Sequence, residues 1–412
     1  MKTIKLDSIL LFALVIPFIM TYRLGWGDTP IWLFGVIFLE LFLYIFLDIS
    51  HFFLESKKIL LKNILLWMTI ITVLGSAFTA AIIVRHQTSP IYNVHDIVLQ
   101  QEAAIKFLVH GQNPYATNYF STPLKDWHYS DTEINPALYH FVMEPFYVLF
   151  AVPFYLIMGH GIGFFDARVP LLFLFALLLI AASILVKDPE KKRQFLVLLA
   201  FNPANLGYLL EGRDDIFMLT FLFISLVFLF KKHFLWSSVV LALAFTVKQS
   251  SWFVLPFYAF FLYTQTKDIK KVIWYMIPFA AVFSVIVAPF FLWNYKAFLD
   301  STIFYLSGNT SHSYPVAGYG WGALLHQVGY IRDVHAYYPF WIWEAIIGMP
   351  MLGGLLWWQK KHSSVKSVWI MYGLFLFVFW YFSRYFNNSH LGYISMLFII
   401  AYFWPETEKE LK

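Results

Sequence analysis

The sequence lacks cysteine altogether. A chain without cysteine has no disulfide bond, no thiolate nucleophile and no metal site that depends on thiolate ligands. Charged residues are also scarce: they make up 13% of the 412 residues, against about a quarter in a soluble domain. No polar stretch is long enough to form a separate globular domain, so these deficits exclude an ordinary soluble protein.

Apolar residues take the place of the missing charges. They form 60% of the chain, the mean hydropathy is +0.66, and apolar runs recur along the sequence. Runs of roughly 20 residues are long enough to cross a bilayer core of ~30 Å. The first run, 6–22, lacks a small-residue cleavage site and is followed by further runs, so we interpret it as an uncleaved helix. We therefore predict an all-α, polytopic protein of the cell membrane.

Twelve apolar runs qualify as transmembrane helices, and one further run does not. The run 139–158 contains Pro145 and Pro153, each of which removes a helix hydrogen bond. Counting it as a span would also place the basic stretch 187–193 on the same side as the loop 85–138, although short basic loops favour the cytoplasm. We predict that 139–158 is re-entrant or lies on the membrane surface. The predicted spans are 6–22, 30–50, 63–84, 168–186, 194–210, 216–230, 234–247, 252–266, 272–293, 336–358, 367–383 and 390–404.

This assignment gives the two sides of the membrane different chemistry. Most of the 29 lysine and arginine residues fall in short inner loops, which places both termini in the cytoplasm. The outer segments hold most of the histidines and many acidic residues, so a reaction centre is expected on the extracytoplasmic side. We divide the chain into an N-terminal transmembrane hairpin (1–62), a main membrane module (63–404) and a short cytoplasmic tail (405–412).

The stretch 92–116, YNVHDIVLQQEAAIKFLVHGQNPYA, follows the third predicted span. Apolar residues recur at helical spacing from Ile97 to about Val109, and Gly111 ends the pattern. We predict a juxtamembrane helix along the outer surface, with Asp96 at its start. Asp96 has two compatible interpretations: an N-cap whose carboxylate accepts from free helix amides, and a catalytic base held in place by that position.

A second stretch, FNPANLGYLLEGRDDIFMLTF (201–221), places Arg213 beside three acids, Glu211, Asp214 and Asp215, at a short outer turn. A charge at mid-membrane costs ~2.5–3.5 kcal/mol on insertion scales. Three acids at a membrane-facing turn therefore differ from the charges of an ordinary surface turn. They form either a solvated turn favoured by the dipole of the next helix, or part of a reaction centre.

Isolated basic residues, Lys248, Arg384 and Arg168, lie near the outer ends of other predicted spans. Singly, each would snorkel to lipid phosphates. Together in one cavity they would bind a phosphate ligand, which arginine grips through its forked donors. Two other patterns carry no site: GHGIGFF (159–165) is interpreted as a turn, and HYSDTE (128–133) lacks the spacing of a helical metal-binding pair.

Five motifs in order resemble the GT-C superfamily of membrane glycosyltransferases, which use polyprenyl-phosphate sugars. They are EAAIKFLVHGQNPYA after Asp96, NPANL…EGRDD, VKQSSWFVLP, YPVAGYGWGALL and SRYFNNSHLGY. Within that superfamily the chain is similar to the mannosyltransferase-like glycosyltransferase family 87. The resemblance covers about residues 63–404, and the order of the motifs is a stronger signal than any one of them. Two spans precede the one expected first, and the oligosaccharyltransferase signature WWDYG is absent, which favours transfer of a single sugar.

The resemblance implies that Asp96 is the base of the first outer loop, and that Asp214 or Asp215 is the acid of the second. A base would take the proton of an acceptor hydroxyl, and the leaving lipid phosphate needs cationic stabilisation. The candidates to bind the donor phosphate are Arg384, Lys248, Arg168 and Arg213. The candidates to line the substrate cavity are Glu102, Asn113, Tyr115, Tyr319 and His390.

The predicted function is thus a hexosyltransferase with a polyprenyl-phosphate sugar donor and a glycan, glycolipid or envelope-polymer acceptor. No nucleotide-binding fold is present, so a donor on the outer face must be carried by a lipid. We predict no cofactor, no metal and no nucleic-acid partner. The main alternative is a lipid or solute transporter or flippase, although transporters place charges in mid-span, where this sequence has few. A non-catalytic assembly partner is the third possibility, and it would tolerate loss of Asp96.

Overall fold

The computed structural model describes residues 3–128, 133–161 and 163–406. Within these residues the ordered structure is almost entirely helical, which confirms the all-α prediction. The α-helices are α1 (Leu6–Thr21), α2 (Ile31–Ile49), α3 (Glu55–Ile70), α4 (Ser76–Thr88), α5 (Asp96–Val109), α6 (Pro145–Gly161), α7 (Arg168–Leu185), α8 (Pro189–Ala200), α9 (Pro203–Leu210), α10 (Asp215–Phe230), α11 (Phe234–Phe245), α12 (Leu255–Thr266), α13 (Ile269–Trp293), α14 (Tyr295–Leu299), α15 (Tyr305–Ser307), α16 (Trp321–Gln327), α17 (Phe340–Lys361), α18 (Val365–Tyr381) and α19 (Asn388–Phe403).

Shorter elements join these helices. The π-helical segments η1 (Ile71–Gly75) and η5 (Asp300–Phe304) each join two α-helices, and the 3₁₀ segment η4 (Gln249–Val254) leads into α12. The 3₁₀ segments η2 (Pro123–Asp126) and η3 (Pro136–Leu138) lie in the connection between α5 and α6. Two short strands, β1 (Ala317–Gly318) and β2 (Tyr385–Phe386), pair in parallel. The pairing joins the long loop before α17 to the turn between α18 and α19.

Several helices are long and apolar enough to cross a membrane. Among the described residues they are Ile31–Ile49, Glu55–Thr88, Arg168–Leu185, Ile269–Trp293 and Phe340–Lys361. Shorter apolar helices, including α1, α10, α11 and α18, lie among them. The chain is therefore a membrane protein with several apolar helices, whereas the count of twelve spans stays a prediction.

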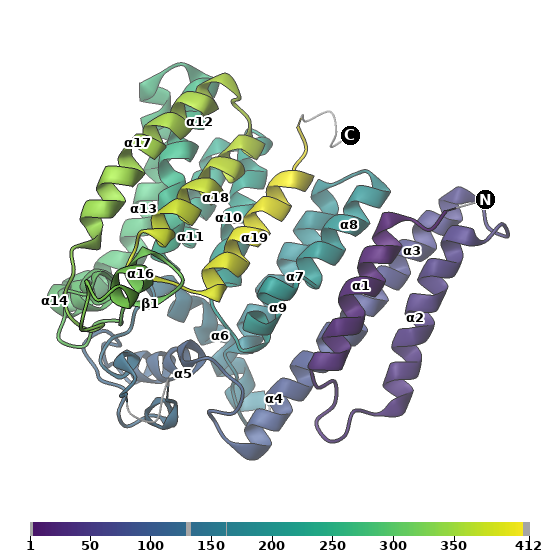
Figure 1. The fold of residues 1–412 in the computed structure, drawn as a ribbon, viewed down its shortest axis with the longest axis horizontal. Helices are drawn as coiled ribbons and strands as arrows, with labels where there is room; N and C mark the ends of the chain where they lie inside the picture. Colours follow the sequence, from purple (N-terminus) through teal and green to yellow (C-terminus); the bar gives the residue numbers. More distant parts are fainter. Residues whose placement is uncertain (1–2, 129–132, 162, 407–412) are drawn as a thin grey trace.

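The helices form one bundle, and α5, called here the cap, covers one end of it (Figure 1). In Figure 1 the long helices run roughly side by side, and α5 lies across the lower end of the bundle. The start of α1 and the end of α19 lie at the opposite, upper end. The segment that carries α5 and the described ends of α1 and α19 therefore lie at opposite ends of the bundle.

The apolar run around Pro153 forms a single helix, α6. The helix begins at Pro145, where a missing N–H is tolerated, and it continues through Pro153. The side chain of Gln101, on α5, donates a hydrogen bond of 2.6 Å to the carbonyl of Tyr147. This contact and the packing of α6 on α5 and α7 tie the run to the cap. Its re-entrant placement stays a prediction.

The predicted span 194–210 is two helices, α8 and α9, and not one. The break lies at Asn202 and Pro203. Pro203 has no N–H to continue the ladder, and the side chain of Asn202 accepts from the amide of Ala204. The same side chain donates to the hydroxyl of Ser395 at 2.7 Å, so the break also holds α19. A proline within an apolar run thus ended the helix here, whereas Pro153 did not.

Buried charges attach the N-terminal hairpin to the rest of the bundle. The ammonium of Lys62 lies 3.0 Å from Asp7 and 2.8 Å from Asp48, and Arg193 on α8 lies 2.6 Å from Asp7. Buried charges persist when they are paired in this way. The boundary proposed at residue 62 falls inside the continuous helical segment Glu55–Thr88.

The sidedness can be tested by labelling, because the chain has no cysteine of its own. Lys191, on α8, and Ser311, in the loop before β1, are both exposed. We expect Lys191→Cys to react with an impermeant maleimide from the cytoplasmic side and Ser311→Cys from the outer side. The cysteine-free parent protein is the control. Labelling of both positions from one side would contradict the topology.

Candidate active site

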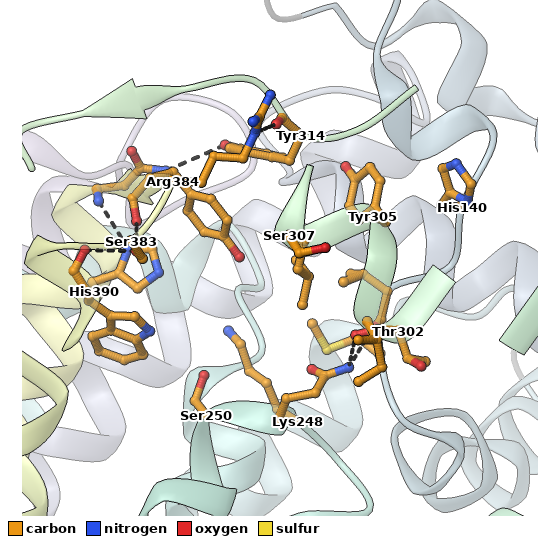
Figure 2. Close-up of a pocket in the computed structure, with 18 of the residues that line it drawn as sticks. His140, Lys248, Ser250, Thr302, Tyr305, Ser307, Tyr314, Ser383, Arg384 and His390 are labelled. Atoms are coloured by element: carbon orange, nitrogen blue, oxygen red, sulfur yellow. Dashed lines mark hydrogen bonds between the residues drawn. The ribbon is translucent and has the colours of Figure 1, made fainter. Parts of the chain in front are cut away.

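A cavity of about 600 Å³ opens at the end of the bundle that carries α5. We call it the main cavity. Its wall is formed by the start of α5, the turn before α10, η4, the η5–α15 segment and the turn between α18 and α19. In Figure 2 the labelled side chains of these segments surround one space, with Lys248 reaching into it. The predicted site residues that line it are Asp96, Arg213, Asp214, Asp215, Lys248, Arg384 and His390.

The start of α5 is fixed against the turn that carries the second group of acids. The amide of His95 donates a hydrogen bond of 2.8 Å to the carbonyl of Glu211. Gly212, in that turn, has φ +87°, and a side chain there would overlap Val98 of α5. Because glycine alone allows this conformation and this approach, two stretches more than a hundred residues apart meet at one wall.

Asp96 is buried and its carboxylate is held from two sides. The side-chain amide of Asn135 donates to Oδ2 at 3.1 Å, and Nδ1 of His95 lies 2.8 Å from Oδ1. Nδ1 lies farther, at 3.4 Å, from the amide of Ile97, so we place its proton toward the carboxylate. A carboxylate fixed by two donors and facing a cavity has the geometry of a base.

The N-cap interpretation of Asp96 is wrong. His95 occupies the N-cap position with an extended backbone, and Asp96 is the first helical residue. The sequence also did not indicate Asn135, which lies 39 residues farther along the chain. An asparagine followed by proline, as at Pro136, is ordinarily a turn signal, so no local pattern links Asn135 to Asp96.

Asp214, Asp215 and Lys248 form a compact group at the cavity wall. The ammonium of Lys248 lies 2.9 Å from Asp214 and 2.7 Å from Asp215. Both carboxylates are buried and the lysine side chain is about one-fifth exposed. An ammonium has three N–H donors, so one remains for a ligand in the cavity when the other two serve the carboxylates.

The two arginines of the cavity have different surroundings. The guanidinium of Arg213 lies over the ring of Tyr208 at 4.3 Å and 3.5 Å from Glu211. Arg384 is buried, and its guanidinium donates to the backbone carbonyls of Tyr314, Val334 and Ala336.

Gly308 leaves room for this guanidinium: its φ is +86°, and a side chain there would overlap Arg384. Arg384 therefore ties the loop before α17 to the cavity wall. Its role in binding a donor phosphate stays a prediction.

Arg168 and Glu102 do not line the main cavity among the described residues. Arg168 is fully buried and its guanidinium makes two hydrogen bonds, of 2.9 and 2.8 Å, to Asp166. Glu102 makes two hydrogen bonds, of 2.7 and 2.8 Å, with Arg85, which also bonds to Asp166. Burial alone would raise the pKa of Asp166, but the hydrogen bonds from Arg168 and His86 and the arginine charges outweigh burial and lower the pKa well below its usual range. This buried network joins α4, α5 and α7 beneath the cap.

The remaining predicted cavity residues lie elsewhere. Tyr115 is buried, its hydroxyl donates to the carbonyl of Met143 at 2.8 Å, and its amide donates to the side chain of Asn113. These residues shape the segment that follows α5. Tyr319 lines a neighbouring pocket that adjoins the main cavity.

Sequence reasoning missed Gln249. Its side-chain amide donates to the carbonyl of Val142 at 2.9 Å, to the carboxyl of Glu144 at 3.1 Å and to the carbonyl of Thr302 at 3.1 Å. It thus holds three segments of the cavity wall together. Its position directly after Lys248 was the available signal.

The lining of the main cavity holds two groups of side chains. The acids and cations described above are called here the charged end. Aromatic side chains of η4, α17 and α18, called here the aromatic end, are Trp252, Phe253, Phe340, Trp341 and Phe379. A ligand that fits both ends has a charged group joined to a long apolar one.

No cluster of three or more histidine, aspartate or glutamate side chains suited to a metal ion occurs within the described ranges. Most of the HYSDTE stretch, residues 129–132, lies outside those ranges. Three of the described acids of the cavity, Asp96, Asp214 and Asp215, are instead paired with Lys248, His95 or Asn135.

The contacts of Arg384 to the loop before α17 can be tested by substitution. We expect Arg384→Lys to lower turnover and to increase proteolysis within 308–339, because lysine keeps the charge but has no fork to reach three carbonyls. Limited proteolysis and sugar transfer are measured side by side, with Arg332→Lys, in the same loop and exposed, as the control. Unchanged proteolysis together with lost turnover would assign the fork to a substrate instead.

Comparison with known proteins gives one match. A family model described as glycosyltransferase family 87 matches residues 141–403, well over half of the chain. No curated protein and no solved structure matches. The matched range includes Asp214, Asp215, Lys248 and Arg384 and begins after Asp96. A family of transferases gives no support to the transporter alternative. The chain belongs to glycosyltransferase family 87 and is an enzyme that transfers a sugar, as its resemblance to GT-C enzymes predicted.

Proposed function

We propose that this enzyme transfers a single hexose, such as mannose, from a polyprenyl-phosphate donor to an acceptor hydroxyl on the extracytoplasmic face. The observation that supports the proposal is the main cavity, which joins a polar, charged end to an aromatic end. A polyprenyl-phosphate sugar has the matching parts, since its phosphate and sugar are polar and its tail is apolar.

The donor phosphate is assigned to the charged end. Lys248 has an N–H left for a phosphate oxygen, and Arg213 lies at the same wall. Arg384 serves as a positioning residue that holds the loop over the cavity. The first isoprene units lie against the aromatic side chains of α17 and α18, and the rest of the tail extends into the lipid.

The reaction is a direct displacement. The carboxylate of Asp96 takes the proton of the acceptor hydroxyl while the acceptor oxygen forms a bond to the anomeric carbon. The bond from that carbon to the phosphate oxygen breaks, and the lipid phosphate leaves with the electron pair. Lys248 and Arg213 stabilise the charge that grows on the leaving phosphate. A base of this kind contributes typically ~10²–10⁴ in rate.

The second acid group has a supporting role in this scheme. Asp214 and Asp215 hold the ammonium of Lys248 in place through contacts of 2.9 and 2.7 Å. The group has two carboxylates and one lysine, so carboxylate oxygens remain to accept hydrogen bonds from the hydroxyls of the transferred sugar. The end of the bundle that carries all three acids faces the outside, in agreement with the basic inner loops.

The test is a comparison of donors with the purified enzyme in nanodiscs. We expect transfer from a short-chain polyprenyl-phosphate hexose and none from a nucleoside diphosphate hexose, because the nucleotide sugar has no apolar chain for the aromatic end. A polyprenyl phosphate without sugar should inhibit, since it fills both ends. Efficient transfer from the nucleotide sugar would contradict the proposal.

A further inference from the structure

A second pocket, called here the side pocket, adjoins the main cavity and has a volume of about 460 Å³. This volume falls within the range of small-molecule sites, about 300–1,000 Å³. His95, Arg213, Tyr314 and Asn387 line both spaces. The two spaces therefore share a wall, and a ligand in one can reach a ligand in the other.

The side pocket has a different lining from the main cavity. Besides the shared Tyr314 and His95, its aromatic side chains are Trp127, Tyr208 and Tyr319, each of which carries a polar atom. Asparagine side chains and the Glu211–Arg213 pair line the same pocket. Flat rings next to amides, a carboxylate and a guanidinium suit a pyranose, which has an apolar C–H face and a rim of hydroxyl groups.

We propose that the side pocket binds a saccharide unit of the acceptor, an inference that rests on the proposed function. The donor enters the main cavity from its aromatic end, beside α17. The acceptor enters from the loop end, through the side pocket. The two substrates meet at the shared wall.

The geometry of that wall places the acceptor hydroxyl beside the base. His95 lines both spaces and its Nδ1 lies 2.8 Å from Asp96. A hydroxyl that crosses from the side pocket past His95 reaches the carboxylate of Asp96. The backbone of His95 is itself fixed, through its amide, to Glu211 of the side pocket.

Several side chains of the side pocket are held in place before any ligand binds. The indole N–H of Trp127 donates to the carbonyl of Val94 at 2.8 Å, and Arg213 is stacked on Tyr208 at 4.3 Å. The side chain of Asn387 donates to the hydroxyl of Tyr314 at 3.4 Å. A preformed site loses less side-chain entropy on binding, which favours recognition of a weakly binding ligand such as a sugar.

Tyr319 gives the sharpest variant, because its side chain is 63% exposed and its removal does not disturb the core. Tyr330 lies in the same loop, is 69% exposed and does not line the side pocket, so Tyr330→Ala is a matched control. The probes are octyl hexopyranosides as acceptors, octanol as the acceptor without a sugar, and a polyprenyl-phosphate hexose as donor. Binding of the octyl glycosides without donor is followed separately, by saturation-transfer NMR of their ring protons.

We expect Tyr319→Ala to raise the KM for the glycoside acceptor roughly tenfold while the KM for the donor stays unchanged. The ring protons should receive saturation from the wild type and lose it in Tyr319→Ala, and Tyr330→Ala should behave as wild type. Any of three results would overturn the inference. Octanol could be as good an acceptor as the glycosides, the KM for the donor alone could change, or the ring protons could still receive saturation from Tyr319→Ala. If the wild type transfers from no lipid-phosphate sugar, the proposed function fails, and the NMR result still decides whether the pocket binds a saccharide.

Discussion

Replacement of Asp96 by asparagine is expected to lower sugar transfer by about 10²–10⁴-fold, the usual contribution of a general base. The amide has nearly the shape of the carboxylate but takes no proton at neutral pH. Its oxygen can still accept the hydrogen bond that Asn135 donates to Oδ2. The change therefore removes the chemistry and leaves most of the surroundings in place.

The effect on folding should be small. Asp96 is the first residue of α5, where a negative charge is favoured by the helix dipole by about 0.3–1 kcal/mol. Asparagine loses that contribution and, because its side chain has one acceptor oxygen, it also loses one of the two contacts that Asn135 and His95 make with the carboxylate. The N-cap, His95, is unchanged. Asp126→Asn, an exposed acid in the same loop, is the control.

The measurement is transfer from a radiolabelled polyprenyl-phosphate hexose at matched protein levels, together with donor binding. Donor binding in Asp96→Asn should remain within a few-fold of wild type. Transfer within a few-fold of wild type would remove Asp96 as the base. The search would then move to Asp214 and Asp215.

Loss of the Lys248 charge should have the second large effect. In Lys248→Met, two buried carboxylates lose their shared cation. Breaking a fully buried ion pair destabilises a protein by about 3–5 kcal/mol, and the value here should be smaller because the lysine is partly exposed. We expect a lower melting temperature. We also expect kcat/KM for the donor to fall at least about a hundredfold, since the leaving phosphate loses a cation.

A double variant separates the two effects. Asp215→Asn combined with Lys248→Met removes one charge of each sign, so the melting temperature should recover most of its loss. The kcat/KM for the donor should not recover, because the cation is still missing. Lys296→Met, an exposed lysine before η5, is the control for charge alone. A double variant with wild-type KM for the donor would show that Lys248 only stabilises the fold.

Much of the fold followed from local patterns in the sequence. Apolar runs predicted the helices because each must bury its backbone polar groups internally in lipid. The juxtamembrane helix was predicted at 97–109 and is found at Asp96–Val109, because helical spacing and Gly111 are both local signals. Prolines were less informative: Pro203 ends a helix where Asn202 caps the next one, whereas Pro153 lies within α6.

The site was predictable only in part. Lys248 and Arg168 looked alike in the sequence, as single basic residues at the outer ends of apolar runs. In the structure Lys248 lines the main cavity, whereas Arg168 is fully buried against Asp166. Tyr319 and Glu102 were likewise expected in one cavity, and they line two separate pockets.

The sequence by itself determined that this protein is a helical membrane protein in which several acids cluster in short turns between helices. Composition and spacing carry that information, since hydrophobicity and helical period act over short distances. The tertiary structure alone decided which charges pair with one another and which face the cavity. Those pairings join residues such as Asn135 with Asp96 and Lys248 with Asp214, 39 and 34 positions apart, and only the packing of α5 against the turn before α10 brings both groups to one wall.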